Sequence, residues 1–157
     1  MSEESRRKAL NTAAAVLQYK NRSRQELYQR LLEKDVAEED AAYAVERLVE
    51  LGLMDDGAYA QSLAHNYAAR GYGPARVRQE LKKHLLEEED ISAALEDFSP
   101  DYDKMNAYIR SRLGGKTPDR REIKKITDGL FRRGFSWGDI RHAMQEYTDA
   151  LEDCCDD

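Results

Sequence analysis

Apolar residues recur along this chain with the spacing of helices. Near the N-terminus, Leu10, Ala13, Ala14 and Leu17 follow the i, i+3, i+4, i+7 pattern of one buried stripe. Similar stripes follow through the rest of the sequence, and no segment alternates apolar and polar residues as a half-buried strand does. The pattern therefore predicts an all-α protein of about nine helices.

One helical pattern occurs three times, at a period of about 50 residues. Its copies lie at residues 36–45, 86–95 and 135–144, and each begins with a large apolar residue followed by an aspartate and an alanine at fixed distances. A period of this size is typical of a tandem array of one helical unit. We therefore expect three tandem three-helix repeats in an elongated, curved array, a shape that offers a long binding surface.

Breaks in the chain divide this array. Gly52 is expected at a positive φ after the third helix, and Ser99 with Pro100 forms the most linker-like joint. The predicted repeats are residues 1–54, 55–99 and 100–151, followed by an acidic disordered tail at 152–157.

Helix starts can be read from capping residues. Ser23 and Glu26 have the spacing of a capping box, and Pro74 suits a first helical position. In the third repeat, Thr117 is expected to cap the middle helix and Pro118 to be its first residue. Extra residues in that segment predict the longest of the three middle helices.

Charge adds a second level of organisation. The 157 residues carry a net charge of −6, yet residues 104–141 hold eleven Lys or Arg against four Asp or Glu, a local net of +7. Residues 142–157 hold six acids and no base. A basic third repeat with an acidic tail indicates an electrostatic partner, which nucleic acid could supply. A chance cluster of solvated charges explains the same counts.

The sequence offers no positive case for an enzyme. No glycine-rich loop has the strand before it and the Gly-Lys pair after it that a phosphate loop needs. The three histidines lie too far apart for a local metal motif, so no metal or cofactor is expected. Adjacent Cys154 and Cys155 are expected to be reduced thiols. No secretory signal and no apolar run of roughly 20 residues is present, so a cytoplasmic protein is expected.

Basic side chains near aromatic ones are the candidate partner-binding residues, since guanidinium groups pair with phosphate or carboxylate. In the middle repeat the candidates are Arg70, Tyr72, Arg76, Arg78 and Lys82. In the third repeat they are Arg120, Arg121, Lys124, Lys125 and Arg132. A packing role over the neighbouring repeat explains Tyr72 equally well.

Residues 71–81 read Gly-Tyr-Gly-Pro-Ala-Arg-Val-Arg-Gln-Glu-Leu and resemble the central signature of the RecX family, regulators of the bacterial recombinase RecA. Residues 48–60 and 22–27 are also similar to that family. The chain departs from the family after two middle helices. Where the family usually has Lys-Gly, this chain has Lys34-Asp35 and His84-Leu85, while the third repeat keeps its glycine.

The resemblance implies a non-enzymatic, monomeric regulator built from three-helix repeats. It implies binding to RecA and to the RecA filament on single-stranded DNA, with inhibition of strand exchange and ATP hydrolysis, and thus a place in DNA repair, recombination and the SOS response. Weak direct contact with DNA is compatible with it. The alternative is a direct nucleic-acid-binding protein, because three-helix units can resemble helix-turn-helix folds. A scaffold for another protein partner is a third interpretation.

Overall fold

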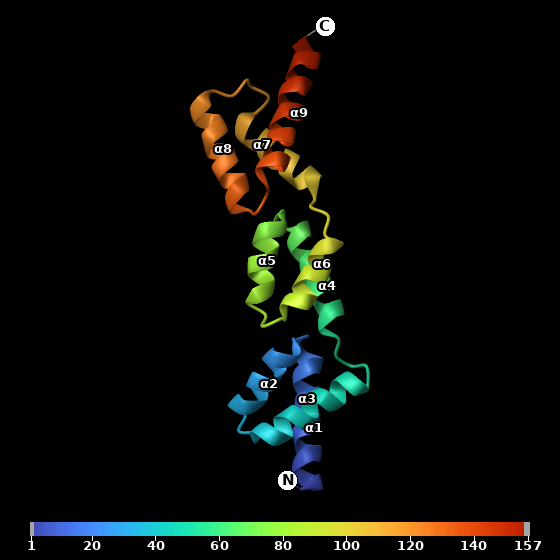
Figure 1. The fold of residues 1–157 in the computed structure, drawn as a ribbon. Coiled ribbons are helices and arrows are strands. Elements are labelled where there is room, and N and C mark those ends of the chain that lie inside the picture. The colour runs from blue at the N-terminus through green and yellow to red at the C-terminus, as the bar shows by residue number, and fades with distance from the viewer. Residues whose placement is uncertain (1, 156–157) are drawn as a thin grey trace. The chain divides into compact units, whose positions relative to one another are not determined.

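The structure is a computed structural model that describes residues 2–155, and in that range it contains nine α-helices and no strand. The helices are α1 (Glu3–Tyr19), α2 (Arg24–Glu33), α3 (Glu38–Glu50), α4 (Asp56–Ala69), α5 (Pro74–Lys82), α6 (Glu88–Glu96), α7 (Tyr102–Leu113), α8 (Arg120–Arg132) and α9 (Trp137–Cys155) (Figure 1). The predicted all-α class is confirmed.

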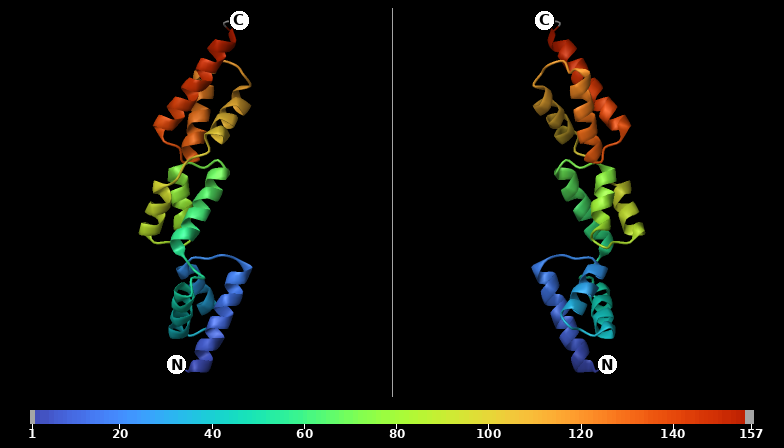
Figure 2. Two further views of the ribbon diagram at one scale, coloured as in Figure 1. Left: turned by 90° about the vertical axis from the view of Figure 1, so that its right-hand side faces the viewer. Right: turned by 90° about the vertical axis from the view of Figure 1, so that its left-hand side faces the viewer.

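The chain folds into two compact units. The N-terminal unit comprises Met1–Leu63 with Leu81–Glu96, and the C-terminal unit comprises Ala64–Glu80 with Asp97–Asp157. In the first unit α1 packs on α3 and α2, and in the second α7, α8 and α9 pack on one another (Figure 2). The division between the units crosses the middle repeat, so the repeat boundaries expected from the sequence stay a prediction.

The buried stripe of α1 differs in phase from the sequence prediction. On α1 the buried residues are Ala9, Ala13 and Val16, whereas the predicted Leu10 and Leu17 are only partly buried. Alanines permit a closer approach of α1 to its neighbours than leucines do, and this close packing sets the rotation of the helix.

On α4 the fully buried positions are three alanines, Ala60, Ala64 and Ala68. Tyr59 and Tyr67, the larger residues of this helix, are only half-buried. Tyrosine pairs an apolar ring with a hydroxyl that seeks a polar partner, which suits the flank of a helix contact better than its centre. The small alanines therefore form the inward face of α4.

Ser23 starts α2 as predicted. Its hydroxyl accepts from the Glu26 amide at 3.2 Å, and Glu26 Oε1 accepts from the Ser23 amide at 2.9 Å. The Ser23 side chain is also fully buried, because its Oγ donates to the carbonyl of His84 at 2.6 Å. A hydrogen bond thus connects the residue before α2 to the turn that follows α5.

An equivalent joint occurs in the C-terminal unit, built from backbone alone. Gly73 stands before α5 as Ser23 stands before α2, and its amide donates to the carbonyl of Arg133 at 2.7 Å. Arg133 precedes Gly134 in the turn after α8, as His84 precedes Leu85 in the turn after α5. One joint uses a side-chain hydroxyl and the other a peptide amide.

The turns after the three middle helices share a left-handed residue. Asp35 has φ 64°, Leu85 has φ 58° and Gly134 has φ 94°. The next residue closes the turn in two of them, with Val36 N donating to Leu31 O at 3.1 Å and Phe135 N to Leu130 O at 3.2 Å. The left-handed position is therefore present also where Asp35 and Leu85 replace the usual glycine. A residue with a Cβ is strained there.

Leu85→Gly is expected to stabilise the protein by up to about 1 kcal/mol, because a left-handed residue with a Cβ costs roughly 1–2 kcal/mol while glycine loses more backbone entropy on folding. Leu85 is 41% exposed, so little packing is lost. Urea unfolding followed by circular dichroism measures the change. Asp35→Gly is the control and should gain less, since aspartate tolerates this region better. A lower midpoint for Leu85→Gly would contradict this account.

Asp56 lies at the start of α4, and its Oδ1 accepts from the Arg24 amide at 3.0 Å. Burial raises the pKa of this carboxyl above its ordinary value of 3.8, and the negative charges of Asp90 and Glu87 add to the rise, while the Arg24 amide opposes it. Folding therefore disfavours the ionised form. The stability associated with Asp56 is present below pH 3.8 and is lost as the pH rises through the native pKa.

Asp56→Asn should consequently be slightly more stable than the unsubstituted protein at pH 7, because the amide oxygen can still accept from Arg24 and carries no charge. The difference should vanish below pH 3.8. Urea unfolding of both proteins at pH 7 and at pH 3 tests this. A less stable variant at pH 7 would show that the carboxylate is favourable in the folded state.

The start of α8 corrects the prediction of Thr117 as cap. The N-cap is Asp119, whose Oδ1 accepts from the Glu122 amide at 2.7 Å, and Glu122 Oε1 accepts from the Asp119 amide at 3.4 Å. Asp119 and Glu122 make the reciprocal pair of a capping box. Thr117 has no such partner, because the residue three places after it is Arg120, whose side chain cannot accept a hydrogen bond. With 13 residues, α8 is longer than α2 (10) and α5 (9), as predicted.

The C-terminal helix α9 extends to Cys155. Residues 152–155, predicted to be a disordered tail, are therefore helical, and the partly buried Leu151 packs against the core of the unit one turn earlier. The last two residues of the predicted tail lie outside the described range. None of the described helices combines the length and the apolar character needed to cross a membrane.

Candidate partner-binding surface

The outer face of α8 is basic. All five cations predicted there are exposed; they are Arg120, Arg121, Lys124, Lys125 and Arg132. The opposite face holds Ile126, Gly129 and Leu130 in the core, which fixes the rotation of the helix. Lys124 Nζ lies 3.4 Å from Asp128 Oδ2, but both side chains are largely exposed, so this pair is weak and leaves the face positive.

Two aromatic rings lie exposed beside this face. Phe131 on α8 is 53% exposed and Trp137 at the start of α9 is 51% exposed, and their ring centroids are 5.1 Å apart in a stacked arrangement. Neither residue is among the candidates predicted from the sequence. A signal was present, because Phe131 directly follows the buried Leu130 and so falls off the stripe that Ile126 and Leu130 define.

Ile123 on α8 is a third exposed apolar residue, with 39% of its surface exposed. Together with Phe131 and Trp137 it gives the basic face three apolar neighbours. We call these three residues with the five cations the α8 face.

Tyr72 is held within its own unit. Its ring stacks on Tyr67 with centroids 5.9 Å apart and planes at 19°, and the Arg76 guanidinium lies 4.9 Å from the centroid of the Tyr72 ring. Arg76 Nε also donates to Glu80 Oε1 at 3.0 Å. Tyr72 and Arg76 therefore both have contacts inside the protein. Their contact with a partner stays a prediction.

The other candidates of the middle repeat are distributed along α4 and α5. Arg70 is exposed after α4, with its guanidinium 5.4 Å from the Tyr67 ring centroid. Arg78 is half-buried on α5, and Lys82 is exposed at the end of that helix. Lys82 belongs to the N-terminal unit, whereas the other nine candidates belong to the C-terminal unit.

The glycines of the signature segment serve a close backbone contact. Gly73 N donates to Arg133 O at 2.7 Å and Ala75 N donates to Gly134 O at 3.1 Å. A Cβ built at Gly73 would lie 2.5 Å from the Gly134 carbonyl carbon, so no side chain fits there without movement. Gly71 has φ 87°, the positive value expected after a helix.

Metal ligands are not grouped in the described part of the chain, where no three His, Cys, Asp or Glu side chains could hold one ion. The charges of the α8 face suit an anionic partner. Its cations can pair with phosphate or carboxylate, and its exposed rings can stack on a flat group or fill an apolar pocket of a partner.

Comparisons with known proteins agree with the repeat pattern. Residues 9–48 match the family model described as RecX, first three-helix domain, and residues 55–95 match RecX, second three-helix domain. A regulatory protein RecX from Xanthomonas axonopodis pv. citri (strain 306) is 39% identical over 135 residues, which cover 85% of this chain and 83% of that protein. One from Stenotrophomonas maltophilia (strain R551-3) is 37% identical over the same shares.

Two solved structures are similar in fold. The crystal structure of RecX from Lactobacillus salivarius superposes with a TM-score of 0.86 at 23% identity, covering 94% of this chain and 99% of that one. A crystal structure of a regulatory protein RecX gives a TM-score of 0.78 at 27% identity, covering 90% of this chain and 72% of that one.

Proposed function

Since this chain belongs to the RecX family of regulatory proteins, we propose that it is a non-enzymatic regulator that binds RecA and the RecA filament on single-stranded DNA. In this proposal it acts in the cytoplasm as a monomer, inhibits strand exchange and ATP hydrolysis, and so modulates DNA repair, recombination and the SOS response.

The α8 face is the observation that carries the proposal. Protein interfaces obtain most of their binding energy from a few aromatic and arginine side chains surrounded by weaker contacts. Phe131 and Trp137 are stacked and half-exposed, and arginines and lysines of α8 lie on the same helix. A filament repeats the same surface many times, so several weak contacts along it could add.

The function is tested by titrating the protein into RecA that hydrolyses ATP on single-stranded DNA. We expect hydrolysis to fall with rising protein concentration. Phe131→Ala combined with Trp137→Ala should require at least about tenfold more protein, the loss expected for central aromatic residues of an interface. Tyr102→Ala is the matched control, because Tyr102 is a 48% exposed ring in the same unit. Unchanged hydrolysis at a large excess of protein would contradict the proposal.

Direct binding of nucleic acid is the second candidate, and the cations of α8 favour it. The net charge of −6 for the whole chain opposes it. Fluorescence polarisation with labelled single-stranded DNA, without RecA and at two salt concentrations, distinguishes direct DNA binding from RecA binding. Tight binding that weakens steeply with salt would favour this second function.

A further inference from the structure

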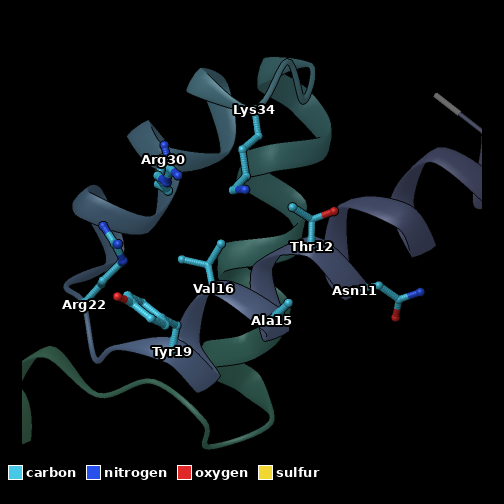
Figure 3. Close-up of a pocket in the computed structure, with 8 residues that line it drawn as sticks. All are labelled: Asn11, Thr12, Ala15, Val16, Tyr19, Arg22, Arg30 and Lys34. Atoms are coloured by element: carbon cyan, nitrogen blue, oxygen red, sulfur yellow. The ribbon is translucent and has the colours of Figure 1, made fainter.

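A second basic surface lies in the N-terminal unit, far along the chain from the residues of the α8 face. A cavity of about 520 Å³ opens between α1 and α2, and its lining includes Tyr19, Arg22, Arg30 and Lys34 (Figure 3). No Asp or Glu is among the described residues that line it. Three cations without a lining acid are unusual in a chain whose net charge is −6.

The cations come from three places around α2. Arg22 precedes the helix, Arg30 lies in its last turn and Lys34 caps its C-terminus. Figure 3 shows their side chains around the same opening, with the end of Lys34 directed toward it. Arg30 Nη1 donates to Glu33 Oε2 at 2.9 Å, and this exposed pair offsets part of one charge. The carbonyl end of α1 adds roughly half a negative charge, which three cations exceed.

Arg22 has donor capacity that the protein does not use. Its Nε is buried and has no hydrogen-bond partner among the described residues. A buried donor without a partner is costly, and a phosphate or carboxylate oxygen at a guanidinium removes that cost. A phosphate or carboxylate oxygen at this guanidinium would therefore suit Arg22.

Tyr19 indicates which kind of anion fits the cavity, a nucleotide phosphate or a peptide carboxylate. Its side chain is 88% exposed, and Figure 3 shows its ring beside Arg22 at the mouth of the cavity. The aliphatic residues of the lining, Ala15 and Val16, are both short. They give a long apolar side chain of a peptide little to contact, whereas an exposed ring can be a stacking platform for a nucleobase.

We propose that the α1–α2 cavity binds a nucleotide, with the phosphate held by Arg22, Arg30 and Lys34 and the base stacked on Tyr19. The nucleotide is either free or part of a single strand, because both present the same phosphate and base. The proposal does not rest on RecA binding, and its test contains no RecA, so either can fail alone.

The test uses the full chain with three probes: ATP, inorganic tripolyphosphate and a labelled deoxythymidine 10-mer. ATP is expected to bind with a Kd on the order of 10⁻⁴ M, as is usual for non-specific phosphate contacts at physiological salt. Tripolyphosphate should bind about tenfold more weakly, because it has no base to stack. If the 10-mer binds more tightly than ATP through the same residues, the ligand is a nucleotide of a single strand; the opposite order identifies a free nucleotide.

Two variants divide the site into its parts. Arg22→Gln combined with Lys34→Gln should weaken ATP at least about tenfold and flatten its salt dependence, since two phosphate contacts are lost. Tyr19→Ala should remove the preference for ATP over tripolyphosphate while leaving tripolyphosphate unchanged. Arg7→Gln combined with Lys8→Gln is the control, because these exposed α1 residues change the net charge equally outside the cavity. Circular dichroism confirms that each variant is folded.

Three results would overturn the proposal. The first is no binding of ATP or the 10-mer at millimolar concentration. The second is equal loss of ATP binding in the control variant, which would reduce the effect to net charge. The third is a glutamate-rich peptide that competes with ATP as well as tripolyphosphate does, which would identify an acidic protein segment as the ligand.

Discussion

Gly134→Ala is expected to destabilise the C-terminal unit by about 3 kcal/mol or more, through backbone strain and overpacking together. Gly134 has φ 94°, and an added Cβ would collide with the Arg76 amide nitrogen and lie 2.5 Å from the Arg76 Cβ. The turn cannot move away freely, because Gly73 N and Ala75 N both donate to carbonyls of this turn, at Arg133 and Gly134. Urea unfolding followed by circular dichroism measures the loss.

Substitutions at two other glycines measure the effects of backbone strain and of steric overlap separately. Gly114 has φ 57° and open space around a built Cβ, so Gly114→Ala should cost only about 1 kcal/mol. Gly73 is not among the residues with positive φ, yet its Cβ would lie 2.5 Å from the Gly134 carbonyl oxygen and 2.7 Å from the Phe135 nitrogen. Gly73→Ala should therefore resemble Gly134→Ala more than Gly114→Ala. Equal midpoints for Gly114→Ala and Gly134→Ala would contradict a close backbone joint.

The two joints explain why glycine is required after α8 but not after α5. In the C-terminal unit the peptide groups of Gly73 and Gly134 approach directly, and no Cβ fits. In the N-terminal unit the Ser23 hydroxyl reaches the His84 carbonyl at 2.6 Å. A side chain spans that joint, so Leu85 can occupy the left-handed position with only conformational strain.

Local features of the fold could be predicted from the sequence. Ser23 with Glu26, Gly52 at φ 74° and Pro74 at the start of α5 each depend on residues within one turn of chain. The start of α8 was missed because Pro118 suggested a first helical residue, while Asp119 with Glu122 forms the cap that the structure uses.

Features that depend on tertiary packing could not be predicted in the same way. The stripe on α1 differed in phase because Ala9 and Val16, rather than larger leucines, meet the neighbouring helices. Arg76 was selected for its charge, but the ring of Tyr72 and the carboxylate of Glu80 that hold it are known only once the helix is placed. The basic side of α8 was accessible to sequence reasoning, because helical periodicity alone puts its cations opposite Ile126 and Leu130.

Reversing Arg120, Arg121, Lys124 and Lys125 to Glu is expected to reduce inhibition of RecA by on the order of 100-fold while changing stability little. Charges at an interface speed association and orient the partner, and like charges facing each other oppose it. All four side chains are exposed, and exposed charges contribute little to folding. The concentration that halves RecA-dependent ATP hydrolysis gives the first quantity, and a circular dichroism melt gives the second.

A pair of double variants tests whether position or net charge is responsible. Lys124→Glu with Lys125→Glu changes the net charge as much as Arg7→Glu with Lys8→Glu does, and all four residues are exposed. We expect the α8 pair to lose inhibition and the α1 pair to keep it. The loss should shrink as salt is added, because screening weakens attraction and repulsion alike. If both pairs lost inhibition equally, the overall charge of the chain would be the cause; if the quadruple variant inhibited RecA normally, the α8 face would not be the contact surface.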